Sequence, residues 1–437
     1  MDSTIFFNPV FISIILLCVL CLCKVNVLLS IMISAIIAGI CAKMNITEIM
    51  NTFIAGMGNN SETALSYILL GAVAAAMSQT GLADVLTKKI SKVIKNNKYV
   101  LFIILTIIAM FSQNLIPVHI AFIPILIPPL LGVMNSLKID RRAVACCLSF
   151  GLKMPYIAVP AGFGLIFQSL IADHIIQNGM VVVKADVWKY TWVLGLGMFI
   201  ALLYAIFISY RKPREYKNIE LSTSEQNADN SKFNKDHYIT LFAALVTLVI
   251  QIMTKSLPLG ALAGLGIIFG TGTIKHHKMD KLMDEGVGLM GYIAFVMLVA
   301  AGFAAILKST GGIETFVNSI ISFLPANKII ASALMLFTGL FITIGIGTSF
   351  GTIPILAVIF VPVFISLNFS PAESIIVLAA AAALGDAGSP ASDTTLGPTS
   401  GLNADGQHNH IWDTCIPTFL HYNISLIVAA LIGVAIF

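Results

Sequence analysis

Residues 385–395 have the sequence GDAGSPASDTT and interrupt an otherwise apolar part of the chain. Glycine and proline favour a break in a helix at this point. Asp386 and Asp393 would be costly inside a bilayer unless they had a function, and the hydroxyl side chains around them can help to hold a cation. A polar break within an apolar helix is typical of the binding sites of membrane transporters.

The composition of the whole chain places this break inside a membrane. Of 437 residues, 58% are hydrophobic and 11% are charged, against roughly 25% charged in soluble domains. Only helices or closed barrels satisfy the backbone in lipid, and no barrel-like alternation is present. The first apolar run lacks a cleavage site, so we expect it to stay in the mature protein. Apolar stretches about long enough to span a bilayer lie near residues 5–23, 25–42, 63–80, 188–209, 238–254 and 413–436.

Short motifs recur along the chain at one fixed offset. The recurring motifs, each 230 residues apart, are Gly56-Met57-Gly58 with Gly286-Val287-Gly288, Thr80-Gly81 with Thr310-Gly311, and Ile123–Leu126 with Ile353–Leu356. A constant offset indicates an internal repeat rather than a chance likeness between apolar helices. We therefore predict two repeats, residues 1–210 and 237–437, joined by the polar, solvated linker 211–236.

Each repeat contains one segment that does not fit a simple span. Residues 99–135 are 37 mostly apolar residues, about 55 Å as a straight helix, and they are interrupted at 112–117. The corresponding segment 329–367 is interrupted at 345–351. We predict two re-entrant hairpins with polar tips, each followed by a span broken by glycine and proline, near 151–164 and 385–401.

The basic residues predict how the chain crosses the membrane. If the hairpins do not cross, each repeat has five spans, and the second repeat enters the membrane inverted. Sorting the 25 Lys and Arg on this topology places 18 on one side, 6 on the other and Lys153 within a span. The positive-inside rule then favours an all-α protein of ten spans, with both termini outside the cytoplasm and the linker inside.

Ionisable and hydroxyl side chains at the two breaks are the candidate cation ligands. Hard cations such as Na⁺ prefer carboxylate, hydroxyl and carbonyl oxygens, and a broken helix supplies free carbonyls. The alternative is that Lys153 and Asp386 form a buried ion pair that only holds the two broken helices together. The candidates at the breaks are Lys153, Asp386, Ser389, Asp393, Thr394 and Thr395.

The hairpin tips supply a second group of candidates. We expect Ser112, Asn114, Thr348 and Ser349 to lie where a helix begins, so that free amides and hydroxyls face an ion or an anionic group. Simple helix capping is the alternative for all four. His119, just past the first tip, fits either a proton acceptor or a packing residue.

Other polar motifs leave their roles open. The loop 405–413 contains His408 and His410 with two aspartates, which fits either a metal or pH-sensing cluster or a solvated turn. His421 fits either the site or packing. No nucleotide-binding, hydrolase or zinc motif occurs, so we expect neither an enzyme nor a resident cofactor. The basic residues lie in loops and do not indicate nucleic-acid binding.

The break at 385–395, together with the stretches 408–413 and 417–423, resembles the NhaC-type Na⁺/H⁺ antiporter family along the whole chain. It is most similar to a bacterial subgroup associated with carriage of amino acids, histidine among them. That family belongs to the ion-transporter superfamily. The resemblance implies an elevator motion of residues 99–175 and 329–410, and a cation site at Asp386, Ser389 and Asp393. Such transporters are often dimers.

These observations predict a cation-coupled secondary transporter of the inner membrane. Na⁺/H⁺ exchange is the reaction that the resemblance favours, with Na⁺, H⁺ or both as the coupling ions. The alternative is Na⁺- or H⁺-coupled uptake of an amino acid such as histidine, or of a small organic acid, in which Lys153 would pair with the substrate carboxylate. A channel or a membrane scaffold is a third reading, but broken helices with closed hairpins favour an occluded site.

Overall fold

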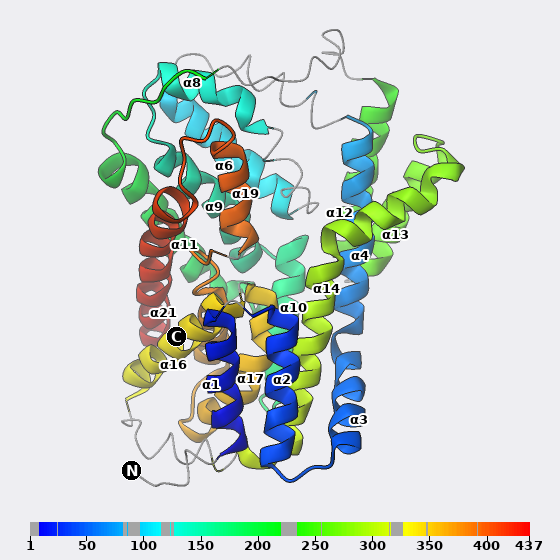
Figure 1. Cartoon of the computed structure of the whole chain (residues 1–437), viewed down its shortest axis with the longest axis vertical. Coiled ribbons are helices and arrows are strands. Elements are labelled where there is room, and N and C mark those ends of the chain that lie inside the picture. Colours follow the sequence, from blue (N-terminus) through cyan, green and yellow to red (C-terminus); the bar gives the residue numbers. More distant parts are fainter. Residues whose placement is uncertain are drawn as a thin grey trace.

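The chain folds into helices throughout the part that the structure describes (Figure 1). In this computed structural model no strand occurs within the described ranges, which confirms the predicted all-α class. The described residues are 8–23, 25–81, 85, 97–114, 123, 126–219, 234–254, 256–313, 315, 327–346, 348–390 and 392–437.

Helices of very different lengths succeed one another along the chain. Those before the linker are α1 (Pro9–Leu22), α2 (Val27–Cys41), α3 (Ile46–Met57), α4 (Ser61–Gln79), α6 (Lys98–Asn114), α8 (Leu131–Ser136), α9 (Arg141–Ala158), α10 (Phe163–Gln177) and α11 (Trp188–Tyr204). Those after it are α12 (Lys235–Thr254), α13 (Leu257–Gly270), α14 (Met279–Ser309), α16 (Lys328–Ile346), α17 (Ser349–Ser366), α18 (Pro371–Ala383), α19 (Asp393–Leu402), α20 (Ile416–Thr418) and α21 (Ile424–Ile436). Wide π-helical turns, η5 (Ala205–Ser209), η7 (His410–Cys415) and η8 (Phe419–Asn423), adjoin α11, α20 and α21.

By length and composition, four helical stretches within the described residues can cross a membrane, and a fifth is formed if the bent pair α9–α10 counts as one span. Six shorter apolar helices accompany them. The chain is therefore a multi-span helical membrane protein. The number of ten spans stays a prediction.

Helix boundaries recur at the offset found in the sequence. The paired starts are Val27 with Leu257 (α2 and α13), Lys98 with Lys328 (α6 and α16), and Arg141 with Pro371 (α9 and α18), each pair 230 residues apart. The short motifs therefore mark corresponding helices in the two halves of the chain.

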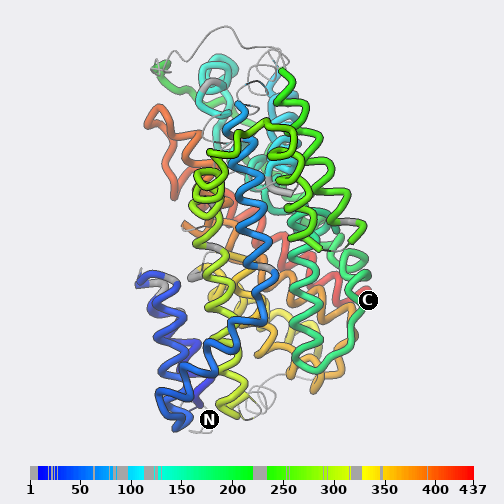
Figure 2. Tube along the Cα trace, turned by 90° about the vertical axis from the view of Figure 1, so that its right-hand side faces the viewer, coloured from blue at the N-terminus to red at the C-terminus, as the bar shows by residue number. Residues whose placement is uncertain are grey.

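The helices pack in two groups that meet along α14 and α17. The long helix α14 lies against α2, α3, α4 and α17, as both views show (Figures 1 and 2). The second group contains α9 packed on α6 and α11, with α18 packed on α16, α17 and α21. Small side chains allow the close approach: a Cβ added at Gly339 of α16 would lie 2.6 Å from the Cβ of Ala381 of α18.

Polar caps define where the inner helices begin. Asp140 accepts a hydrogen bond from the Arg142 amide at 3.0 Å and caps α9. Ser370 and Glu373 form a capping box at the start of α18, with Pro371 in the first turn, where its missing N–H costs nothing. Because α17 and α18 are buried over nearly all of their residues, these caps fix the ends of helices enclosed by protein.

Candidate ion site

Two helices break at the centre of the second group. The axes of α9 and α10 differ by 49° across residues 159–162, and residues 384–392 separate α18 from α19. Gly385 and Gly388 have positive φ angles of 80° and 104°, a region that favours glycine. A Cβ at Gly388 would lie 2.4 Å from the Cβ of Phe419. Glycine is therefore required for the path of the second break.

The Asp386 carboxylate lies in the second break and accepts hydrogen bonds from four side chains. Its Oδ2 receives Lys153 Nζ at 3.2 Å, the Tyr156 hydroxyl at 2.9 Å and the Ser349 hydroxyl at 2.8 Å. Its Oδ1 receives the Ser392 hydroxyl. The side chains of Lys153 and Asp386 are 0% and 7% exposed. Three separate parts of the chain thus converge on one buried carboxylate.

The predicted hydroxyl residues lie around the same break but bond mainly to backbone. Thr394 Oγ1 donates to the Asp386 carbonyl at 3.2 Å and lies 2.9 Å from Ser392 Oγ. Thr395 Oγ1 donates to the Ser389 carbonyl, and Ser389 Oγ donates to Ile344 O at 3.1 Å. These bonds satisfy carbonyls that the broken helix would otherwise leave free.

Asn423, on η8, holds the backbone of the break from the opposite side. Its Nδ2 donates to the Ala387 carbonyl at 2.9 Å, and its Oδ1 accepts from the Gly385 amide at 3.1 Å. The residue is buried. A buried amide that donates and accepts in this way fixes the loop on both sides of Asp386.

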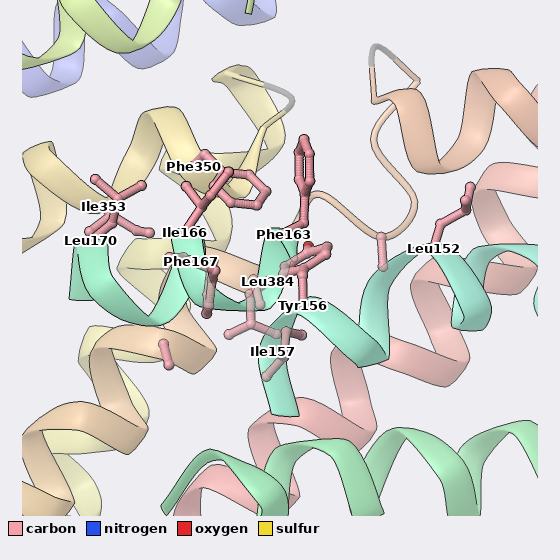
Figure 3. Close-up of a cluster of buried hydrophobic side chains, with 14 of the residues drawn as sticks. Leu152, Tyr156, Ile157, Phe163, Ile166, Phe167, Leu170, Phe350, Ile353 and Leu384 are labelled. Atoms are coloured by element: carbon pink, nitrogen blue, oxygen red, sulfur yellow. The ribbon is translucent and has the colours of Figure 1, made fainter. Parts of the chain in front are cut away.

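Aromatic side chains surround the Tyr156 ring (Figure 3). Its centroid lies 5.1 Å from that of Phe167 and 5.2 Å from that of Phe350. Phe350 in turn lies 5.8 Å from Phe163 and 5.9 Å from Tyr67. The hydroxyl of Tyr156 therefore points to Asp386 while its ring belongs to a packed aromatic cluster, which excludes water from that side of the acid.

The structure brings together most, but not all, of the predicted residues. Lys153 and Asp386 form the expected buried contact, and Ser349 of the second hairpin joins them. Thr348 is the N-cap residue of α17, as expected, although its side chain makes no capping bond. Asp393 begins α19, and within the described part of the chain it makes no hydrogen bond or ion pair.

The prediction for the first hairpin tip was wrong. Ser112 and Asn114 lie in the last turn of α6, not at the start of a helix, so carbonyls rather than amides are exposed there. Ser112 Oγ donates to Ala109 O at 3.1 Å, within its own helix. Serine hydroxyls commonly bond back in this way, which lets the helix continue past a polar residue. His119 lies outside the described residues.

Sequence reasoning missed Tyr156, Ser392 and Asn423. The repeat carried a signal for Tyr156, because it lies 230 residues before Asp386 and so occupies the corresponding position in the first half. It also lies three residues after Lys153, on the same face of α9. Ser392 and Asn423 carried no comparable signal, since only the folded loop brings them near the acid.

The loop 405–413 is tied down by ion pairs, so the solvated-turn reading was wrong. Arg141 binds both oxygens of Asp405, at 2.7 and 2.6 Å. Burial raises the pKa of Asp405, but the bonds from Arg141 outweigh it and hold that pKa below its usual value. Burial lowers the pKa of His408 to about 4. No group of three or more His, Cys, Asp or Glu suited to a metal occurs within the described ranges.

The first residues of the linker also join this network. Arg214 Nη1 donates to Asp413 at 2.7 Å, and the Lys217 amide donates to Gln407 Oε1 at 2.8 Å. His421, whose role was open, packs against Tyr204 and Tyr210. The described end of the linker therefore binds the loop of the second half.

A multi-span helical protein with a buried ion pair where two helices break belongs to the class of membrane transporters. The model of the Na⁺/H⁺ antiporter family matches residues 146–434, and that of a Na⁺-H⁺ antiporter family matches residues 8–94. The chain thus belongs to the Na⁺/H⁺ antiporter family, as its resemblance to the NhaC-type family predicted, and its role is transport rather than catalysis.

Relatives of nearly the same length agree. The chain is 47% identical to an uncharacterized membrane protein of Vibrio parahaemolyticus, over 96% of this chain and 98% of the relative. It is 46% identical to an uncharacterized membrane protein of Haemophilus influenzae, over 96% and 97%. It is 43% identical to a Bacillus subtilis protein named "Putative amino acid transporter YuiF", over 96% and 98%.

Two solved structures share the fold at low sequence identity. The YdaH transporter of Alcanivorax borkumensis matches with a TM-score of 0.59 and 14% identity, over 89% of this chain and 87% of that one. MtrF of Neisseria gonorrhoeae, described as one of a class of antimetabolite efflux pumps, matches with a TM-score of 0.58 and 15% identity, over 90% and 84%. At this identity the likeness concerns the fold alone.

Proposed function

We propose that this protein is a cation-coupled secondary active transporter in which Na⁺ and protons exchange at Asp386. The observation that carries the proposal is the buried Asp386 carboxylate, which contacts one ammonium and three hydroxyls. A buried ion pair of this kind contributes little net stability when compared with apolar residues, so its presence favours a function.

The donors around Asp386 are also suitable cation ligands. If the Lys153 ammonium leaves, a Na⁺ in its place meets the carboxylate together with the hydroxyl oxygens of Tyr156, Ser349 and Ser392. Oxygen ligands are those that hard cations prefer. Lys153 then releases one proton as one Na⁺ binds, and it takes up one proton when the Na⁺ leaves. The exchange needs no group beyond these side chains.

We further propose that residues 1–210 and 237–437 are inverted repeats of five spans, each with a re-entrant hairpin, which work by an elevator motion. The recurrence of helix starts at an offset of 230 residues supports this arrangement. The sorting of basic residues supports termini outside the cytoplasm of an inner-membrane protein.

Coupled uptake of an amino acid is the second candidate function. The name of the Bacillus subtilis relative favours it, because that protein is 43% identical over nearly the whole chain. In this case ion binding at Asp386 would drive the movement of a solute bound elsewhere in the same protein.

The test uses proteoliposomes loaded with a pH-sensitive dye and given a Na⁺ pulse, with and without radiolabelled amino acids. We expect the parent protein to move protons and Asp386→Asn to lose this activity at normal expression and reconstitution. Asp186→Asn is the matched control, because Asp186 forms an exposed ion pair with Lys189 at 2.7 Å, away from the site.

Parent-like proton movement by Asp386→Asn would remove the acid from the exchange site. Accumulation of a labelled amino acid that collapses with the ion gradient would establish the second candidate and overturn pure exchange.

A further inference from the structure

A cavity of about 420 Å³ lies between α4, α10 and the start of α11, apart from the residues that contact Asp386. Its volume falls within the range of about 300–1,000 Å³ that is usual for small-molecule sites. A bare Na⁺ needs far less space. The cavity is therefore suited to an organic solute.

Side chains of both charges line this cavity. Glu62 of α4 and Asp173 of α10 are acidic, and Lys184, which precedes α11, is basic. Lys184 and Asp173 form an ion pair in which the side chains are 57% and 35% exposed, so both remain accessible to a ligand. Trp188 adds an aromatic face. A solute with a positive and a negative group close together is complementary to this lining, because each of its charges meets the opposite sign.

The deeper wall is polar and buried. Ser66 and Gln168 line it and are 0% and 2% exposed. Gln168 Nε2 donates to the carbonyl of Ile157 at 3.1 Å. Ile157 is the next residue after Tyr156, whose hydroxyl touches Asp386. A ligand held by Gln168 therefore lies against the segment that presents Tyr156 to the acid.

We propose that this cavity binds a zwitterionic α-amino acid, with its ammonium group on Glu62 and Asp173 and its carboxylate on Lys184. The inference rests on the proposed function, because the bound solute is moved only if ion binding at Asp386 drives the change of conformation. It adds a solute site, and a chemical class for the solute, to the ion site.

Binding is measured on the purified full chain in detergent, without ion gradients. The twenty common amino acids are screened by the rise in unfolding temperature that a ligand of the native state causes, and each one that raises it is titrated by calorimetry. We expect at least one to bind. Its methyl ester, which lacks the carboxylate, and its N-acetyl derivative, which lacks the ammonium, should each bind at least tenfold more weakly.

Glu62→Gln and Asp173→Asn should each raise the Kd about tenfold or more, while Asp186→Asn leaves it unchanged. Elution as a single species and an unchanged unfolding temperature without ligand show that the variants fold. The inference is overturned if no amino acid binds, if both blocked derivatives bind as well as the parent compound, or if neither variant changes the Kd.

The dye assay on the parent protein keeps the two proposals apart. Na⁺-driven proton movement without amino-acid binding would sink the solute site and leave the exchanger. Amino-acid binding that depends on Glu62, without Na⁺-driven proton movement, supports the solute site and contradicts the exchange reaction.

Discussion

Removing one partner of the Lys153–Asp386 pair should destabilise the protein far more than removing both. At the observed separation of 3.2 Å and an effective dielectric constant of 20, the attraction is about 5 kcal/mol. The loss of solvation of two buried charges offsets most of it. The pair is thus nearly neutral as a unit, but each charge alone would be left in a site that excludes water.

We therefore expect Lys153→Met and Asp386→Asn each to lower the free energy of unfolding by about 3–5 kcal/mol. Lys153→Met should lie near the lower value, because Tyr156, Ser349 and Ser392 still donate to the carboxylate. The double variant should stay within about 1–2 kcal/mol of the parent.

The assay is denaturant unfolding of all four proteins in the same detergent, followed by tryptophan fluorescence and circular dichroism. The measured quantity is the coupling energy of the double-mutant cycle. If the two single losses simply add in the double variant, the coupling is zero, and the reasoning about a paired unit is refuted.

Three further predictions concern the surroundings of the site. Burial lowers the pKa of His408 from its ordinary 6.5 to about 4, so stability is full above pH 6.5 and falls by about 1.4 kcal/mol per unit as the pH drops towards 4; His408→Gln should flatten this slope in denaturant titrations. Asp405→Asn should cost about 3 kcal/mol at neutral pH, because it leaves the Arg141 guanidinium buried. The lowered pKa of Asp405 keeps this contribution constant between pH 5 and 8 and removes it only as the pH falls below about 4 and through the folded-state pKa, which unfolding at several pH values checks. Gly388→Ala should cost about 3 kcal/mol or more through strain and overlap, whereas Gly266→Ala, with open space around it, should change stability by less than about 1 kcal/mol in the same unfolding assay.

The sequence was most informative where the membrane restricts the choice of partners. A lysine and an aspartate within apolar spans have few possible neighbours, so the contact between Lys153 and Asp386 could be predicted. Repeated motifs likewise predicted which helices correspond, because glycine and proline positions keep their spacing. These inferences used polarity and distance along the chain alone.

Other features depended on contacts between distant parts of the chain. Asp405 looked solvated because Arg141 lies 264 residues away. Asn423 stood in a recognised motif without an assigned role, because only the folded loop brings its amide to Gly385. Ser112 was placed wrongly because a single serine does not end a helix whose other residues favour it.

The ammonium that already neutralises Asp386 has an electrical consequence under the proposed exchange. A Na⁺ that replaces it, while Lys153 loses its proton, leaves the net charge of the site unchanged. A membrane potential of 100 mV does about 2.3 kcal/mol of work on each charge that moves through it, but none on a site of constant charge that changes sides with either ion. The protein would then carry no current, and concentration differences alone would set the direction of transport.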